Sequence, residues 1–421
     1  MRMRLGVCAL ACTLMGSAAG FARAADIAPV HHEPNPPNSK KARKAHYVVM
    51  VSLDGFRWDY ATKWGAPHLL KMAEEGASAP DGMLPSFPSL TFPNHYTLVT
   101  GLYPSHHGIV DNEFLDPARN YEEYYYKTPS KATDGSWYGG VPLWSLAEKQ
   151  GMRSAAMFWV GSESKIAGER PSYWVPFDDK FDDEKRIAQV MEWLSLPEAE
   201  RPHLITLYYS NVDHAGHDFG PDSQECRDAV HHLDALMGEL EDKLKATGLP
   251  VDMVIVSDHG MVKFADRHWV GLDKLVEMKG AKSSGQNIYP ESESEKERIY
   301  AGLKGLNDPR FTVYRLKDVP KNFDMSANQR EGDPVVVPLE LYPIIVHAKV
   351  DQVKGLGGHG FDPARVPEMK AIFYAEGPDV KPGVKVASFR NVNVYDFVCG
   401  MLGLKPAKND GEKKVLKAAR R

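Results

Sequence analysis

The sequence has few cysteines, few long apolar runs and no excess of positive charge. Only 4 of its 421 residues are cysteines, which excludes a small scaffold held together by many disulfides. The longest apolar stretch, LGVCALACTLMGSAAGF, begins at residue 5 and is too short and too rich in small residues for a good membrane span. The formal net charge of −5 gives no support to binding of a nucleic-acid polymer through bulk electrostatics.

The N-terminal segment has the composition of a secretory signal peptide. Residues 1–4 read MRMR, the apolar stretch follows, and residues 22–24 read ARA, a small-x-small cleavage motif. We therefore expect cleavage after Ala24 and a periplasmic or secreted protein. Cleavage would leave Cys226 and Cys399 in the mature chain, so that any disulfide would be a single one.

Several short apolar runs lead directly into acidic residues. HYVVMVSL precedes Asp54, LITLYYSN extends to Val212 before Asp213, and VDMVIVS precedes Asp258. Nearly continuous apolar strands indicate a sheet covered on both faces, and amphipathic segments lie between them, most clearly over residues 223–246. This alternation predicts a three-layer α/β/α sandwich with a central, mostly parallel sheet. Ligands bind at the carboxyl ends of such strands, so the three carboxylates predict a functional site there.

One large domain accounts for most of the chain, over residues 46–405. The pattern changes at about residues 295–345, which are predicted to form a small inserted α+β lobe. Residues 25–45 are rich in proline and then basic, and are predicted to be a flexible leader. Residues 406–421 read as a basic tail without a core pattern.

Four short motifs combine carboxylates with histidines: SLDGFR, DHAGH, SDHG and GGHGFD. Carboxylate and imidazole ligands together suit zinc, and three protein ligands leave one position open for a substrate. Each motif alone is common in ordinary loops, and it is their joint occurrence at strand ends that favours a metal centre. Two three-ligand sites are predicted: Asp213, His217 and His359 in one, and Asp54, Asp258 and His259 in the other.

Thr91 stands at the start of TFPNHYTLVTG, which is predicted to be a helix. Pro93 falls in its first turn, and Gly101 ends it as a C′ residue. A threonine at this place most often serves as an N-cap. The alternative is a nucleophile, held where the helix N-terminus and nearby metal ions favour an oxyanion. The residue alone leaves both interpretations open.

Together these motifs resemble the nucleotide pyrophosphatase/phosphodiesterases of the alkaline phosphatase superfamily, close to the bacterial members. The similarity is carried by VSLDGFR, PSLTFPNHYTLVTGLYPSHHGIVDN, VDHAGHDFGP, VIVSDHGM and GGHGFDPARVPEMKAIFYAEGP, spread over about residues 47–380. It implies the superfamily's α/β/α fold and two Zn²⁺ ions in the two sites named above. It also implies that Thr91 is the nucleophile and contacts the second metal. Asn112 matches the asparagine that hydrogen-bonds a phosphate oxygen.

The resemblance implies hydrolysis of phosphodiester and pyrophosphate bonds in small nucleotides and nucleotide esters. The product would be a nucleoside 5′-monophosphate, released through a phospho-threonine intermediate. Phe92, next to the nucleophile, and Tyr173 are expected to sandwich the base, a contact that tolerates any base. Tyr208 is expected near the same pocket.

Other functions fit parts of the pattern. A lipid or choline-phosphate phosphodiesterase of the same family would need an apolar channel or an aromatic cage. A phosphomonoesterase would need an arginine beside the nucleophile, and none is obvious. A polymer nuclease would want a basic groove. A non-catalytic binding protein would not be expected to keep the nucleophile and all six ligands.

Overall fold

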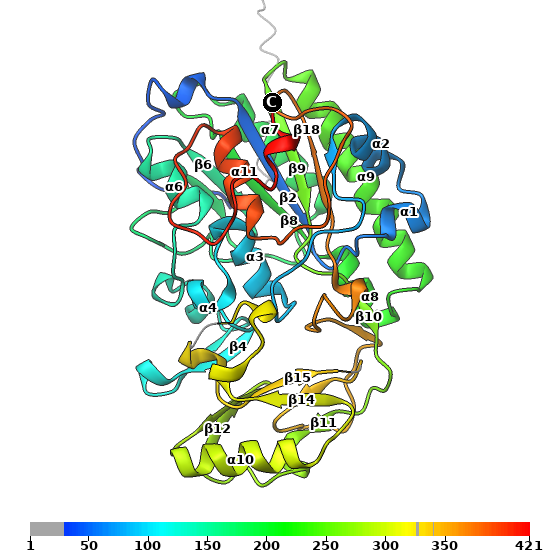
Figure 1. The fold of residues 1–421 in the computed structure, drawn as a ribbon. Coiled ribbons are helices and arrows are strands. Elements are labelled where there is room, and N and C mark those ends of the chain that lie inside the picture. The colour runs from blue at the N-terminus through cyan, green and yellow to red at the C-terminus, as the bar shows by residue number, and fades with distance from the viewer. Residues whose placement is uncertain (1–28, 326–327, 340) are drawn as a thin grey trace, which may run out of the picture.

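The computed structural model describes residues 29–325, 328–339 and 341–421, so the predicted signal peptide lies outside the described residues. A nine-stranded sheet runs through the larger part of the molecule, in the order β1-β7-β6-β8-β2-β9-β18-β3-β19 (Figure 1). The five central strands from β7 to β9 are parallel, and β18 is antiparallel to β9. The strands are β1 (His31–His32), β7 (Tyr173–Val175), β6 (Ser154–Met157), β8 (Leu204–Tyr209), β2 (Tyr47–Leu53), β9 (Val251–Val256), β18 (Phe373–Glu376), β3 (Ala77–Ser78) and β19 (Val384–Lys385).

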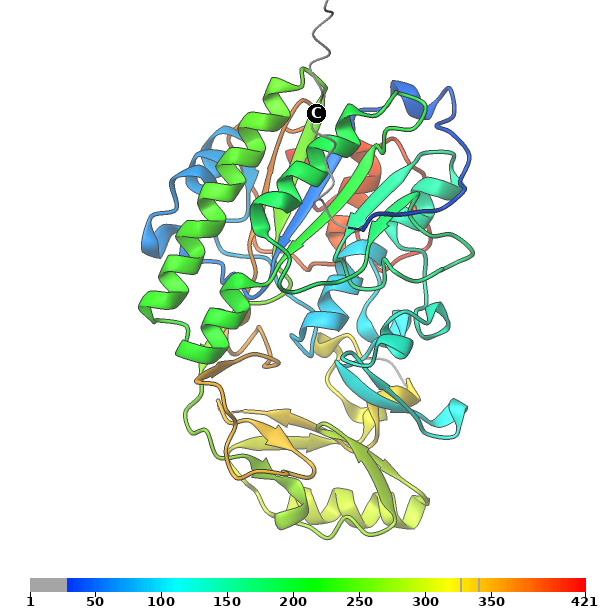
Figure 2. The ribbon, with the colours of Figure 1, turned by 180° about the vertical axis from the view of Figure 1, so that it is seen from behind.

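Helices cover both faces of this sheet (Figures 1 and 2). One face packs against α3 (Thr91–Thr100), α6 (Leu143–Lys149) and α11 (Asn393–Met401). The other packs against α1 (Tyr60–Trp64), α2 (Pro67–Glu75), α7 (Asp183–Ser195), α8 (Asn211–Phe219) and α9 (Gln224–Ala246). Val48 and Met50 of β2 join the first core and Val49 and Val51 the second, because successive side chains of a strand point to opposite faces. The predicted three-layer α/β/α sandwich is confirmed.

The long helix α9 follows the predicted pattern closely. The Ser223 hydroxyl caps it by accepting a hydrogen bond from the Cys226 N–H at 3.1 Å. Its apolar stripe, with Val230, Leu233 and Leu240, is fully buried. Cys226 on this helix and Cys399 on α11 are both buried free thiols.

A smaller lobe has a core of its own and lies below the sandwich in Figure 1. Its core contains Ile288, Leu303 and Phe311. The lobe begins at about residue 270, earlier than the predicted 295, because its first strands are too short and too polar to be read from an apolar run. Its elements are β11 (Val270–Gly271), β12 (Ala281–Ser284), β13 (Asn287–Pro290), α10 (Glu293–Gly305), β14 (Phe311–Tyr314), β15 (Val335–Pro338) and β16 (Ile344–Ile345).

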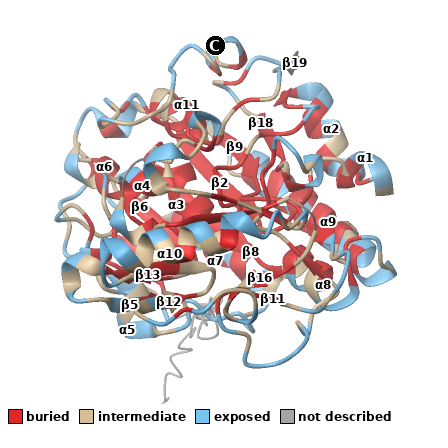
Figure 3. Ribbon diagram, turned by 60° about the horizontal axis from the view of Figure 1, so that its bottom comes forward, coloured by how far each residue is buried: buried red, intermediate tan, exposed pale blue. Residues whose placement is uncertain are grey.

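Figure 3 shows that the most deeply buried residues gather in the central strands and the helices against them. Among the residues that the structure describes, no helix is both long enough and apolar enough to span a bilayer.

Short elements connect the sandwich and the lobe. They are α4 (Pro104–His107), β4 (Glu113–Asp116), β5 (Glu122–Tyr125), α5 (Pro129–Ala132), β10 (Val262–Lys263) and β17 (Gly357–Gly358).

Both chain ends pack on the sandwich, which differs from the predicted flexible leader and coreless tail. In the leader, β1 pairs with β7, and the buried Asn38 donates from Nδ2 to the Glu198 and Arg201 carbonyls at 2.9 and 2.7 Å. In the tail, Leu416 and Ala419 are buried in the core beside α11. Backbone hydrogen bonds add to this, from the Glu33 N–H to the Ser172 carbonyl and from the Arg421 N–H to the Asp379 carbonyl, and composition does not reveal such contacts.

Candidate active site

The carboxyl ends of three parallel strands meet at one edge of the sheet. Ser52 pairs with both Tyr208 of β8 and Val256 of β9, so the three strands end side by side. Asp54 follows β2, Asp258 follows β9, and the helix after β8 carries its acid in the first turn. Strand register brings Asp54 and Asp258 together, and the first turn of α8 adds Asp213 at the same edge.

The first predicted ligand group is assembled from a helix and a loop. Asp213 and His217 lie four residues apart on α8, which places them on one face of the helix. The His217 Nε2 is 3.4 Å from the Asp213 Oδ1 and 3.2 Å from the His359 Nε2. The His359 Nε2 is 3.8 Å from the same carboxylate oxygen. All three side chains thus point at a common centre.

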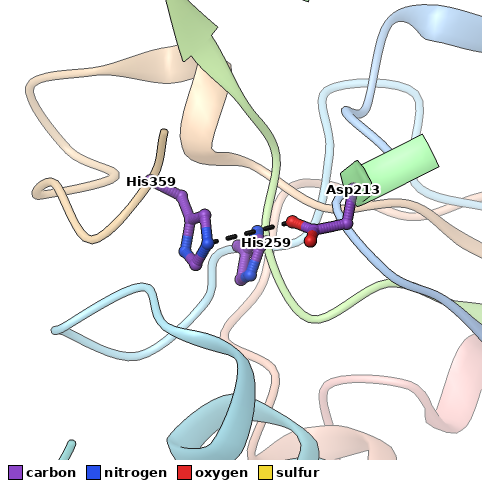
Figure 4. A group of neighbouring side chains, drawn as sticks. All are labelled: Asp213, His259 and His359. Carbon is purple, nitrogen blue, oxygen red and sulfur yellow. Dashed lines mark ion pairs between the residues drawn. The ribbon is translucent and has the colours of Figure 1, made fainter. Parts of the chain in front are cut away.

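The second predicted group surrounds His259. Its Nε2 lies 3.0 Å from the Asp258 Oδ2 and 3.6 Å from the Asp54 Oδ1, and all three side chains are almost fully buried. The rings of His259 and His359 stack with centroids 3.6 Å apart, so the two groups adjoin. Figure 4 shows His259 with Asp213 and His359, and ligand atoms of these three also lie within 4.8 Å of one another.

The donor atoms fit a bound cation. Among the described residues, the Asp54 Oδ1 and the Asp213 Oδ1 are buried without a hydrogen-bond partner, which is costly for a carboxylate unless a cation compensates. Burial and the neighbouring charges of Asp258 and Asp213 raise the pKa of Asp54 well above its usual range. A carboxylate and imidazole donor set suits zinc.

Each ligand histidine is oriented by a backbone carbonyl. In all three, Nδ1 lies 2.9 Å from a carbonyl oxygen, which leaves Nε2 to face the centre. Such contacts fix the ring and its tautomer before any ligand arrives. The carbonyls are those of Gly357 for His217, Gly260 for His259 and Ser89 for His359.

Thr91 is the first residue of α3, and the N-cap position belongs to Leu90. The helix ends at Thr100, and Gly101 follows with φ of 67°, as the sequence predicted. The Thr91 Oγ1 lies 3.2 Å from the His259 Nε2. The hydroxyl therefore faces the ligand groups and does not cap its own helix.

Asn112 lies directly beside the start of α3. Its Oδ1 accepts a hydrogen bond from the Phe92 N–H at 2.9 Å. Its own N–H donates to the Asp111 Oδ1 at 2.7 Å, while the other Asp111 oxygen accepts from the Asn287 Nδ2 of the lobe at 3.1 Å. The lobe thus helps to hold Asn112 next to the threonine.

The expected aromatic residues have three different placements. The Phe92 ring is half-buried and packs edge-on against Tyr126, with centroids 5.2 Å apart. The Tyr208 ring is buried, and its hydroxyl donates to the Asp54 Oδ2 at 2.7 Å. Tyr208 therefore braces a predicted ligand carboxylate, and its expected place near a base pocket stays a prediction.

Tyr173 lies at the other end of the sheet. In β7 it pairs with Ala155, which pairs with Ile205 of β8, about 13 Å before the carboxyl end at about 3.3 Å per residue. Its ring is buried in the core, and its hydroxyl accepts from the Arg153 Nη1 and donates to the Glu200 carbonyl. The structure does not place Tyr173 opposite Phe92, and this expectation needs correction.

Phe177 is an aromatic residue at the carboxyl edge of the sheet that the sequence interpretation missed. It follows the end of β7 at Val175, so it comes out at the carboxyl edge of the sheet. Its side chain is 52% exposed, and its ring lies 6.2 Å from that of Tyr208. The place where β7 ends is the signal that would have found it.

His95 was also missed. It is fully buried on α3, and its Nδ1 lies 3.0 Å from the Thr91 carbonyl and 3.2 Å from the Asp258 Oδ2. Its Nε2 lies 2.8 Å from the Ser52 hydroxyl. The i, i+4 spacing from Thr91 puts both residues on one helix face, which would have indicated it.

Sequence comparison finds relatives over most of the chain. An uncharacterized pyrophosphatase/phosphodiesterase of Schizosaccharomyces pombe is 35% identical over 384 residues, which are 86% of this chain and 78% of the relative. Human ectonucleotide pyrophosphatase/phosphodiesterase family member 1 is 34% identical over 86% of this chain, which spans only 40% of that protein. Both relatives are eukaryotic, so the expected closeness to bacterial members stays a prediction.

Solved structures show the same fold. An inactive variant of murine ectonucleotide pyrophosphatase/phosphodiesterase 5, in complex with AMP, superimposes with a TM-score of 0.82 at 29% identity. The match covers 89% of this chain and 100% of that one. The family model for type I phosphodiesterase / nucleotide pyrophosphatase matches residues 48–362. The chain thus belongs to the type I phosphodiesterase/nucleotide pyrophosphatase family and is an enzyme of that class.

Proposed function

We propose that this protein is a two-zinc hydrolase of small nucleotides and nucleotide esters. It cleaves their phosphodiester and pyrophosphate bonds and releases a nucleoside 5′-monophosphate. The observation that carries the proposal is the Thr91 hydroxyl, which stands at the start of α3 and 3.2 Å from the His259 Nε2. The murine neighbour was solved with AMP, a product of the proposed chemistry.

The two ligand groups supply the metal sites of this proposal. Asp213, His217 and His359 would hold one zinc ion, and Asp54, Asp258 and His259 the other, with Thr91 beside it. When bound, the zinc ions neutralise charge on the phosphoryl oxygens and lower the pKa of a neighbouring hydroxyl.

The protein's own residues carry the remaining steps. The Thr91 Oγ1 attacks phosphorus in line, so that an Oγ1–P bond forms as the bond from phosphorus to the leaving oxygen breaks, and the hydroxyl proton is matched by the proton that the leaving oxygen takes up from solvent. Water then attacks phosphorus, the Oγ1–P bond breaks, one water proton returns to Oγ1, and the monophosphate is released. The Asn112 Oδ1 is engaged by the Phe92 N–H, which directs its Nδ2 to donate to a phosphate oxygen. Phosphoryl transfer depends mainly on such positioning and charge stabilisation.

Two aromatic side chains at the edge of the site, Phe92 and Phe177, form an aromatic rim that selects the nucleotide. Phe92 adjoins the nucleophile, and the exposed Phe177 stands beside Tyr208, whose hydroxyl contacts Asp54. A flat base between the Phe92 and Phe177 rings would be held by stacking, which tolerates all bases. Phe177 takes the role that was expected of Tyr173.

A substrate panel tests the proposed function. The zinc-loaded enzyme is assayed on a nitrophenyl ester of a nucleoside 5′-monophosphate, a dinucleotide, a choline-phosphate ester and a simple phosphate monoester. We expect the first two to be cleaved best, and a quenched reaction to carry phosphate on the Thr91 peptide. A preference for the choline ester would establish the lipid-type alternative, and a preference for the monoester would establish a phosphatase.

We further propose that the enzyme acts in the periplasm or the medium, because residues 1–24 have the composition of an export signal. N-terminal sequencing of the exported protein should begin at Ala25. Intact Met1 in protein collected outside the cytoplasm would contradict cleavage at this site.

A further inference from the structure

We propose that the amino end of the central sheet holds a further divalent-cation site, formed by His46, Asp252 and Asp379 and separate from the active site. Potential ligand atoms of these three residues lie within 4.8 Å of one another. In the part of the chain that the structure describes, the same proximity groups the predicted catalytic ligands Asp54, Asp258 and His259.

The three side chains come from neighbouring parts of the fold. His46 directly precedes β2, Asp252 is the second residue of β9, and Asp379 follows β18. The His46 Nδ1 lies 2.9 Å from the Asp379 Oδ2. The Asp379 N–H donates to the Asp252 Oδ1 at 2.8 Å, which fixes the second acid against the first.

Asp252 supplies the observation that points to a ligand. It is completely buried, and among the described residues its Oδ2 has no hydrogen-bond partner. The backbone closes over it, because a Cβ on Gly377, whose φ is +139°, would come within 2.4 Å of the Asp252 Oδ1. A buried carboxylate oxygen without a partner is rare in native proteins and is normally met by a cation or water.

The nearby Arg421 does not hydrogen-bond the unpaired Asp252 oxygen. The Arg421 Nε donates to the Val380 carbonyl at 2.9 Å, and the Arg421 N–H donates to the Asp379 carbonyl at 2.8 Å. Among the ion pairs of the described residues, His46 is the one partner of Asp379, and Asp252 has none. The two acids therefore share one imidazole as hydrogen-bonded partner, and the charge of Arg421 offsets theirs only in part.

One imidazole and two carboxylates form a donor set that zinc accepts, and a fourth position remains for water. His46 and Asp379 also line a cavity of about 430 Å³, which offers a path from solvent. Four basic residues line the same cavity: Lys41, Lys44, Arg420 and Arg421. Their charge weakens cation binding, so we expect this site to bind zinc more weakly than the active site.

The site is tested by the zinc content of variants at its two partly exposed ligands, His46 and Asp379. Wild type, His46→Gln and Asp379→Asn are dialysed against a series of buffered free-zinc concentrations, and zinc per folded chain is measured by mass spectrometry. We expect both variants to bind about one equivalent less than wild type at the upper end of the series. Equal zinc content in wild type and both variants would overturn the site and leave a proton shared between the two acids as the explanation.

His347→Gln is the matched control. Its Nδ1 lies 2.9 Å from the Asp273 Oδ2 in an exposed pair that belongs to none of the metal-like groups of the described chain. It should keep the wild-type zinc content, and loss of the same equivalent would mean unspecific surface binding and overturn the proposal. The thermal midpoint gives a second measurement: zinc should raise it more in Thr91→Ala than in Thr91→Ala/His46→Gln. Because both measurements are independent of turnover, they separate failure of this site from failure of the proposed function.

Discussion

The two ends of strands β2 and β9 carry similar residues and differ in what surrounds them. At the amino end stand His46 and Asp252, and at the carboxyl end stand Asp54 and Asp258. Asp252 in β9 and Asp258 just beyond its end are six positions apart, or about 20 Å at about 3.3 Å per residue. Both ends gather carboxylates and imidazoles, yet only one of them is built for a reaction.

The difference lies in the elements that reach each end. The carboxyl end receives the start of α3 with its hydroxyl, the α8 ligands and the loop after β17. Two phenylalanine rings edge it, and one of these is half exposed. The amino end receives the chain terminus and a basic cavity lining. Ligands alone can hold a metal, whereas catalysis also needs a nucleophile and a place for the substrate.

Removal of the proposed nucleophile should have the largest effect. Thr91→Ala is expected to lower kcat by several orders of magnitude, as is typical when a covalent nucleophile is removed, and to keep the proposed zinc ions because the six other predicted ligands remain. Steady-state kinetics and zinc analysis of the same preparation check this. Near-native turnover by the alanine variant would show that Thr91 is not the nucleophile, and Thr91→Ser, which restores a hydroxyl, should recover part of the activity.

His95 tests how far the carboxyl end depends on residues behind the ligands. His95→Gln removes the ring that contacts the Thr91 carbonyl, Asp258 and the Ser52 hydroxyl. Loss of such a supporting contact is expected to weaken zinc affinity or activity by about 10–100-fold. Zinc titration with a competing chelator measures the affinity. An unchanged affinity together with unchanged kcat/KM would mean that His95 merely fills the core.

The aromatic rim separates recognition from chemistry. Phe92→Ala and Phe177→Ala should each lower kcat/KM on a nucleotide ester by roughly tenfold, as for one lost stacking contact, and leave a small ester without a base unaffected. Tyr173→Phe, at the amino side of the sheet, should leave both substrates unaffected. Equal losses on both esters would mean that the rings only support the site.

We expect a smaller effect of pH on the free energy of unfolding, and it arises from the buried His107. Burial lowers the pKa of His107 to about 3, whereas in the unfolded chain it is about 6.5. Below pH 6.5 the unfolded chain therefore binds a proton that the native state lacks. This contribution to stability is complete above pH 6.5 and is lost toward pH 3, at about 1.4 kcal/mol per pH unit.

Urea unfolding of wild type and His107→Gln between pH 7 and 5 measures this slope. The variant should be less stable overall. Its free energy of unfolding should change less steeply with pH, by the slope that corresponds to about one bound proton. The same slope in both proteins would assign the pH dependence to other groups.

The sequence by itself determined the alternation of strands and helices and the chemistry of the carboxyl edge. Asp54 and Asp258 follow apolar runs directly, and a parallel sheet brings such run ends to one edge wherever its strands are aligned. Pro93 and Gly101 set the bounds of α3 through backbone geometry alone. These are local properties, so they could be predicted without a partner strand.

Only the tertiary structure decided which side chains face the site. Tyr173 and Phe177 lie in one short stretch, and the end of β7 between them places one at the amino side and the other at the carboxyl edge. Likewise, Asp379 meets His46 across more than three hundred residues of chain. Side-chain direction depends on strand register and on where each strand stops, and these are set by packing between distant segments.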